Sequence, residues 1–217
     1  MTRPGLPAQL RSALPILAWA AAILCSFGVM LVHANAPCPQ PAPQSRWPGA
    51  LARIAPSLQL ARSEDTLVLV AHPQCPCTRA TIGEIAGIVA RTDGRERIYA
   101  VFYEPAAGGK QWTDSDLVRS ARETRGVTVV MDPDARIARA LKARTSGQCD
   151  LYAPSGALVF HGGITASRGE YGDCVGSDAV VSDILTGRAA ERSTPVFGCA
   201  IYGGSASPGE QLTWKTY

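Results

Sequence analysis

The longest apolar segment of the chain runs from Ala13 to Ala34 and contains no Asp, Glu, Lys or Arg. A segment of this length is long enough to cross the hydrocarbon core of a bilayer as a helix. Arg3 and Arg11 precede it, whereas its other flank carries no Lys or Arg before Arg46. By the positive-inside rule, the N-terminus lies in the cytoplasm and the rest of the chain lies on the extracytoplasmic, periplasmic side of a cell membrane.

Small residues at Ala34-Asn35-Ala36 resemble the cleavage site of a signal peptide. The next residue is Pro37, however, which resists cleavage, and the apolar segment is longer than a usual signal core. A lipid anchor on Cys25 is disfavoured, because this cysteine lies inside the apolar segment and the preceding Leu24 is not small. We therefore predict a retained single-pass transmembrane anchor at residues 12–34.

Beyond the anchor, the spacing of apolar residues alternates between strand and helix patterns. Thr66–Ala71 is a continuous apolar run rich in β-branched residues, which is typical of a strand buried on both faces. Apolar residues then recur at helical spacing from Ile82 to Val89, before a stop at Asp93-Gly94. A second strand of the buried type follows at Ile98–Tyr103. The short connections favour a parallel, right-handed crossover between the two strands.

The second half of the chain continues this alternation. We predict a helix at Asp114–Thr124 capped by Thr113 or Asp114, a strand at Val127–Met131, a short helix started by Asp132-Pro133 and ending at Lys142, a hairpin of Gln148–Ala153 and Ala157–His161, and a last helix at Ser177–Leu185 ended by Gly187. The order β-α-β-α-β-α-β-β-α indicates an α/β fold, with a mixed sheet flanked by helices on both faces.

Composition divides the chain further. Residues 35–48 are rich in proline and lack apolar periodicity, which is typical of a semi-rigid spacer. We therefore predict a cytoplasmic N-terminus at 1–11, the anchor, a linker at 35–48, one domain at 49–202 and a loose C-terminal tail at 203–217. The net charge of +3 comes from Arg residues at intervals, without a basic run, so nucleic acid is not expected as a partner.

The chain has seven cysteines, and the predicted position of each relative to the membrane indicates whether it can form a disulfide. Cys25 lies in the anchor, where it behaves as an apolar residue. The others lie in a compartment that permits disulfides: Cys38, Cys75, Cys77, Cys149, Cys174 and Cys199. The sequence alone leaves their pairing open.

The pair Cys75-Pro76-Cys77 lies directly after the first predicted strand and at the start of the first predicted helix of the domain. Unpaired backbone N–H groups and the helix dipole stabilise a thiolate at such a position and lower its pKa. Arg79 adds positive charge nearby. The position therefore predicts a reactive dithiol.

In its element order and in the position of this dithiol, the chain resembles the thioredoxin-like superfamily. Within that superfamily it resembles the RedB-like proteins, which are membrane-anchored thiol-disulfide oxidoreductases of bacterial envelopes. The element order of residues 60–190 carries the likeness, together with three stretches: His72-Pro73-Gln74-Cys75-Pro76-Cys77-Thr78-Arg79, Gly162-Gly163-Ile164-Thr165-Ala166-Ser167-Arg168-Gly169 and Thr194-Pro195-Val196-Phe197-Gly198-Cys199. The resemblance implies a thioredoxin-like fold, Cys75 and Cys77 as catalytic residues, protein thiols or disulfides as partners, and no cofactor.

Three departures from the family pattern stand out. The usual motif is Trp-Cys-x-x-Cys, but here one residue separates the cysteines and Gln74 takes the place of the first one. The family's cis-proline position falls at Ser146-Gly147-Gln148, which contains no proline; Gly147 and Gln148 are then the expected substrate-binding residues. The first strand also carries no Asp or Glu as a proton acceptor. The small ring of a Cys75–Cys77 disulfide would be strained, which favours an oxidising role.

Alternatives remain open for the cysteines. His72, Cys75 and Cys77 could hold Cu(I), with Cys199 or His161 completing the site, in a copper-binding or copper-delivery module. Cys149 is best explained as a buried strand residue. A disulfide could join Cys174 to Cys199, or Cys199 could instead approach the dithiol from the C-terminal segment. A peroxidase ranks last, since no Thr-x-x-Cys arrangement surrounds Cys75.

Overall fold

A computed structural model describes residues 8–188 and 191–202. The tail predicted at 203–217 and most of the N-terminus predicted at 1–11 lie outside these residues. The chain separates into two units, which meet between Ala36 and Pro37.

The first unit contains the helix α1 (Ala8–Asn35). Its segment Ala13–Asn35 is, within the described residues, the one helix whose length and apolar character suffice for crossing a membrane. Large apolar side chains such as Leu17 and Trp19 are exposed along it. An anchor and a signal sequence both require such a helix.

The second unit is built on a five-stranded sheet in the order β3-β2-β1-β4-β5. The strands are β1 (Thr66–Ala71), β2 (Arg97–Glu104), β3 (Val127–Pro133), β4 (Gln148–Tyr152) and β5 (Leu158–Gly163). The first three are mutually parallel, whereas β4 pairs antiparallel with both β1 and β5. The predicted mixed sheet is therefore confirmed.

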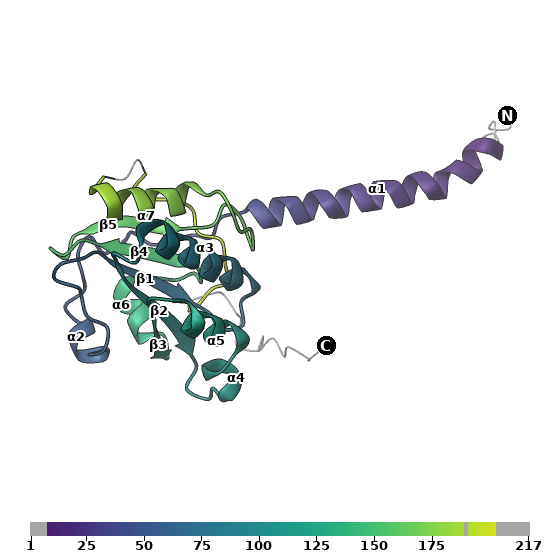
Figure 1. Ribbon diagram of the computed structural model, residues 1–217. Coiled ribbons are helices and arrows are strands. Elements are labelled where there is room, and N and C mark those ends of the chain that lie inside the picture. Colours follow the sequence, from purple (N-terminus) through teal and green to yellow (C-terminus); the bar gives the residue numbers. More distant parts are fainter. Residues whose placement is uncertain (1–7, 189–190, 203–217) are drawn as a thin grey trace. The chain divides into compact units, whose positions relative to one another are not determined.

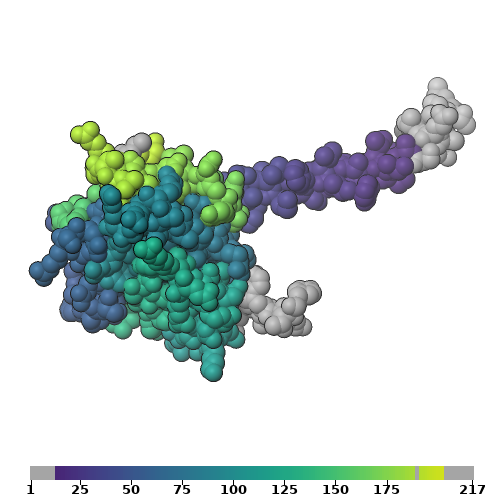
Figure 2. All heavy atoms as spheres, in the orientation of Figure 1, coloured from purple at the N-terminus to yellow at the C-terminus, as the bar shows by residue number. Residues whose placement is uncertain are grey.

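Helices cover both faces of this sheet (Figure 1). One face carries α3 (Pro76–Thr92), α5 (Asp116–Glu123) and α7 (Val175–Thr186); the other carries α2 (Leu51–Ile54) and α6 (Arg136–Leu141), and a short α4 (Lys110–Thr113) precedes α5. Because side chains alternate along a strand, Leu67 and Leu69 of β1 pack under α3, while Val68 and Val70 face the α6 side. Side chains of α3 and α7 also lie against each other at the surface in Figure 2.

Two helices begin later than the sequence predicts. Ser115 caps α5, because its hydroxyl accepts a hydrogen bond from the Val118 amide, so neither Thr113 nor Asp114 is the cap. Pro133 stays in β3, and α6 begins only at Arg136 after two residues in the left-handed region. The stop at Gly187 is confirmed, with φ +68°.

Asp132 caps the N-terminus of α6 although it lies four residues before the helix begins. Its buried carboxylate accepts hydrogen bonds from the amides of Ile137 (2.7 Å) and Ala138 (2.9 Å), which would otherwise be unpaired. We expect Asp132→Ala to lower the free energy of unfolding by about 1–2 kcal/mol. Thermal unfolding of the full chain in detergent would show this as a lower Tm, and an unchanged Tm would contradict the capping role.

The proline-rich segment lies against the domain along most of its length. The Cys38 amide donates to the Val196 carbonyl (2.9 Å), and the Ser45 carbonyl accepts from Leu158 (2.9 Å). A further bridge joins Arg46 to Ala157. The second unit begins at Pro37 and includes this segment, which has backbone partners on the domain. The division into a linker at 35–48 and a domain at 49–202 stays a prediction.

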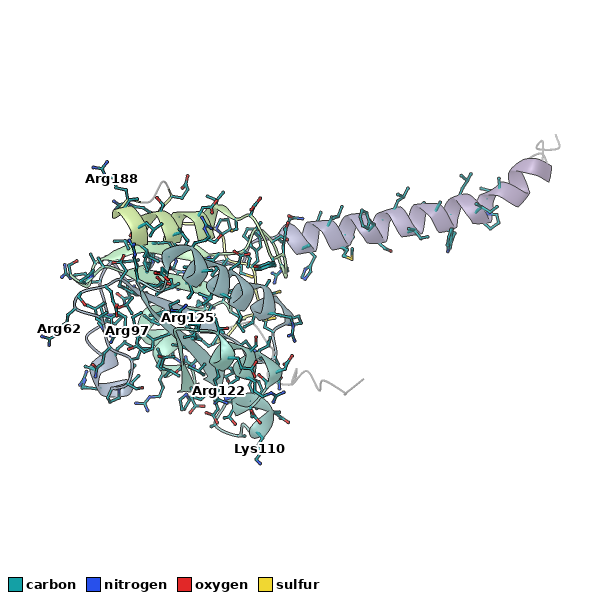
Figure 3. All side chains as sticks on the ribbon, in the orientation of Figure 1. Arg62, Arg97, Lys110, Arg122, Arg125 and Arg188 are labelled. Carbon is teal, nitrogen blue, oxygen red and sulfur yellow. The ribbon has the colours of Figure 1, made fainter. Side chains whose placement is uncertain are left out.

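Basic side chains are distributed over the domain. Figure 3 shows labelled examples on separate elements and connecting segments: Arg62, Arg97, Lys110, Arg122, Arg125 and Arg188. Some are paired locally, as Arg97 is with Glu64 at 3.2 Å.

Candidate functional site

The cysteine pair lies between the end of β1 and the first turn of α3. After Ala71 the chain turns, and the Cys75 amide donates to the His72 carbonyl (3.1 Å). Cys75 is the N-cap residue of α3 and Pro76 occupies the first helical position, where a proline needs no hydrogen-bond partner. The predicted placement of the dithiol at a helix N-terminus is therefore confirmed.

The two thiols differ in exposure. Cys75 is only 1% exposed, whereas Cys77 is half-buried. Beside them, an open pocket of about 590 Å³ is lined by Pro73, Gln74 and Pro76 and by residues of the α4–α5 region. The backbone of the motif is thus accessible on this side, although the Cys75 side chain is not.

Cys75 is the centre of a set of thiol contacts. Interactions with the side chains of Cys199 and Cys77 hold the pKa of Cys75 far below the ordinary 9.0, against the opposing effect of burial. The same contacts, together with burial, raise the pKa of Cys77 and of Cys199 well above 9.0. These pKa directions favour a thiolate at Cys75 and thiols at Cys77 and Cys199.

Arg168 supplies the positive charge of this site. Its guanidinium donates to the Gly198 carbonyl (2.7 Å) and to the Cys38 sulfur (3.2 Å), and it acts on Cys77, where it favours ionisation. We name Cys38, Cys75, Cys77 and Cys199 the thiol cluster. Arg168 and Cys38 were not predicted at this site, because they lie in loops far from the motif along the chain.

Arg79 does not play the role predicted for it. Its guanidinium forms an ion pair with Asp116 at the start of α5, and both side chains are largely exposed. The prediction that Arg79 adds charge at the dithiol is therefore wrong, because the exposed Asp116 carboxylate provides the nearer partner.

The loop before β4 adjoins the dithiol. The Ser146 hydroxyl contacts the Thr78 hydroxyl (2.8 Å) and accepts from the His72 amide (2.9 Å), which ties this loop to the start of α3. Gly147 has φ +94°, a conformation that favours glycine, and its amide donates to Val70. Gln148 is fully buried, with its amide group directed at Asp150. A substrate-binding role for Gly147 and Gln148 stays a prediction.

His72 ends β1 and packs among aromatic rings. Its ring centroid lies 5.1 Å from that of Trp112 and 5.8 Å from that of Tyr103. Burial lowers the pKa of His72, and its Nδ1 accepts a hydrogen bond from the Gln74 amide (3.1 Å). Within residues 8–188 and 191–202, no three His, Cys, Asp or Glu side chains form a group that could hold a metal ion.

The remaining cysteines lie apart from these contacts. Cys149 is fully buried on β4, where burial raises its pKa, so the prediction of a buried strand residue is confirmed. Cys174 is the N-cap residue of α7 and an electrostatic neighbour of Cys149, and all cysteines are free. Cys199 therefore approaches Cys75 rather than forming a bridge with Cys174.

A buried carboxylate near the loop comes from β4 rather than β1. Asp150 is fully enclosed; burial raises its pKa, and His161 Nδ1 lies 2.7 Å from its Oδ1. β1 carries no Asp or Glu, but the sheet still holds a buried carboxylate, because Asp150 lies on the neighbouring strand β4.

No family model and no curated protein matches the chain. Among solved structures, it is similar to an uncharacterised conserved protein of Geobacillus kaustophilus, with 16% identity, coverage of 80% of this chain and 95% of that chain, and a TM-score of 0.54. A hypothetical protein of Sinorhizobium meliloti matches with 22% identity, coverage of 66% and 82%, and a TM-score of 0.52. A secreted Mycobacterium tuberculosis disulfide oxidoreductase matches with 11% identity, coverage of 57% and 82%, and a TM-score of 0.41.

Structural similarity at such low sequence identity shows a shared fold and no more. With a mixed five-stranded sheet, helices on both faces and a dithiol between the first strand and its following helix, the domain has a thioredoxin-like α/β fold. The RedB-like subtype stays a prediction.

Proposed function

We propose that the chain catalyses thiol-disulfide exchange on the extracytoplasmic side of the membrane, with Cys75 and Cys77 as its redox pair. The observation that supports this most directly is the position of Cys75 and Cys77 at the N-terminus of α3, where the neighbouring thiols lower the pKa of Cys75. A thiolate is the reactive form of cysteine in exchange, and a stabilised thiolate is also a good leaving group.

The stabilised thiolate favours donation of disulfides over their reduction. Stabilising the reduced form of a dithiol makes its disulfide a stronger oxidant. In this direction two partner thiolates are joined into a disulfide, and the Cys75–Cys77 bond is broken. Cys75 is released as the thiolate, and Cys77 takes up a proton. The partner gains one disulfide and the protein gains two reduced cysteines.

The apolar helix α1 supports a position at the membrane, and the positive-inside rule supports an extracytoplasmic domain. Partners would then be protein thiols or disulfides of the cell envelope, where disulfides persist. No specific observation favours the copper-binding alternative over exchange.

Equilibration with glutathione tests this proposal. The full chain in detergent is incubated with mixtures of glutathione and glutathione disulfide, quenched with acid, and mapped by mass spectrometry. We expect a reversible internal disulfide that includes Cys75, and Cys174→Ser should behave like the wild type, because Cys174 lies outside the thiol cluster. Failure of Cys75 to enter any disulfide, or a potential below about −300 mV as in structural disulfides, would reject the proposal.

A further inference from the structure

The chain returns to the dithiol through residues 192–201, which we name the C-terminal strap. At its start, the Arg192 carbonyl accepts from the His161 amide (3.0 Å). At its end, the Ile201 amide donates to the Arg144 carbonyl (2.8 Å). The strap is thus fastened to β5 and to the segment before β4, on either side of Cys199.

The backbone around Cys199 is held in one place. Its carbonyl accepts from the Ser146 amide (2.8 Å), and the Gly198 carbonyl accepts from Arg168 (2.7 Å). A Cβ atom at position 198 would lie 1.9 Å from the Ser146 carbonyl oxygen, so only glycine allows this close approach. The position of Cys199 is therefore specified by the backbone on both sides of it.

The cysteine residues of the thiol cluster differ in exposure. Cys75 is 1% exposed, Cys77 is half-buried, and Cys199 is exposed. Cys199 nevertheless lies beside the cysteine pair, because Ser146 donates to the Cys199 carbonyl and also contacts His72 and Thr78. Of these three residues, the most exposed is therefore the one on the strap.

We propose that Cys199 is a third redox-active residue, which passes the disulfide between the enclosed Cys75 and thiol groups of partner proteins. This inference rests on the proposed exchange function and adds the route by which partners reach it. The Ser146 amide and the Arg168 guanidinium donate hydrogen bonds to the strap backbone, which holds Cys199 in position for this transfer.

The transfer proceeds by three exchanges, of which the first lies within the protein and leaves its oxidation state unchanged. In the oxidised protein, the Cys199 thiolate attacks Cys75, the Cys75–Cys77 bond breaks, and Cys77 leaves and takes up a proton. A partner thiolate then attacks the Cys199 sulfur, and Cys75 leaves as the stabilised thiolate. A second partner thiolate displaces Cys199, which takes up a proton, and the partner carries the disulfide away. A low-molecular-weight disulfide such as glutathione disulfide restores the oxidised protein.

Rapid-quench kinetics with glutathione as the thiol test this route. The full chain in detergent is first oxidised, freed of excess disulfide, mixed with glutathione and quenched with acid for peptide mapping. We expect the first glutathionyl adduct on Cys199. Cys199→Ser should be reduced at least about tenfold more slowly while still forming a Cys75–Cys77 disulfide at equilibrium. Cys77→Ser should form a Cys75–Cys199 disulfide on oxidation, and Cys174→Ser serves as the matched control.

The outcomes separate the two proposals. A wild-type protein in which Cys75 forms no disulfide rejects the exchange function itself. An internal disulfide with Cys75, combined with a first adduct on Cys77 and an unchanged rate in Cys199→Ser, keeps the exchange function and overturns the role of Cys199.

Discussion

Replacing Cys75 with serine is expected to abolish exchange, with a loss of about 1000-fold or more in turnover of a glutathione-based disulfide by dithiothreitol. The reason is that both stages of the reaction pass through the Cys75 sulfur, as nucleophile in one direction and as leaving group in the other. A serine hydroxyl is neither ionised nor able to form the mixed disulfide. Fluorescence of a self-quenched glutathione disulfide follows the turnover directly.

Cys174→Ser is the matched control for this measurement. Cys174 is buried at the start of α7, and its side chain forms no capping hydrogen bond. Serine is among the best N-cap residues, so this substitution preserves the helix and removes a thiol at equal size. Turnover by Cys75→Ser that equals that of Cys174→Ser would show that another sulfur performs the reaction.

The second large effect concerns pH. Because the pKa of Cys75 is lowered, its thiolate is lost only as pH falls through that low value, whereas an ordinary thiol is mostly protonated below about pH 8.5. We therefore expect the 240 nm absorbance of one thiolate to persist in the reduced protein at pH 5. The pKa values of Cys77 and Cys199 are raised, so their thiolates form only above pH 9.

A difference titration between the wild type and Cys75→Ser isolates this signal. Cys199→Ala removes the hydrogen bond that contributes most to the lowered pKa, so it should shift the acid midpoint of Cys75 upward. A wild-type midpoint near 8 or 9 would show that the thiolate is not stabilised in the reduced protein.

The alternation of buried strands and amphipathic helices was sufficient to predict the fold. Continuous apolar runs such as Thr66–Ala71 are buried on both faces, and this pattern depends on residues close together in the sequence. Helix starts were less predictable, because Asp132 caps α6 through amides five and six residues ahead rather than at the adjacent turn.

The site was predictable only in its local part. A cysteine between a strand and a helix indicates a reactive thiol, so Cys75 and Cys77 emerged from the sequence. Arg168 and Cys38 reach the cluster through loop conformations and long-range backbone pairing, for which the sequence offers no periodic pattern. The prediction for Arg79 failed for the opposite reason. Arg79 is close to the cysteines along the chain, but its guanidinium pairs with Asp116.

The strap also limits how far the chain can be shortened. Val196, Phe197 and Ile201 are buried, so a deletion that begins at Arg192 would leave apolar surface open to water. The Ser146 amide would lose its carbonyl partner as well. Fragments prepared for crystallography or spectroscopy should therefore extend at least through Ile201, since shorter ones would tend to aggregate.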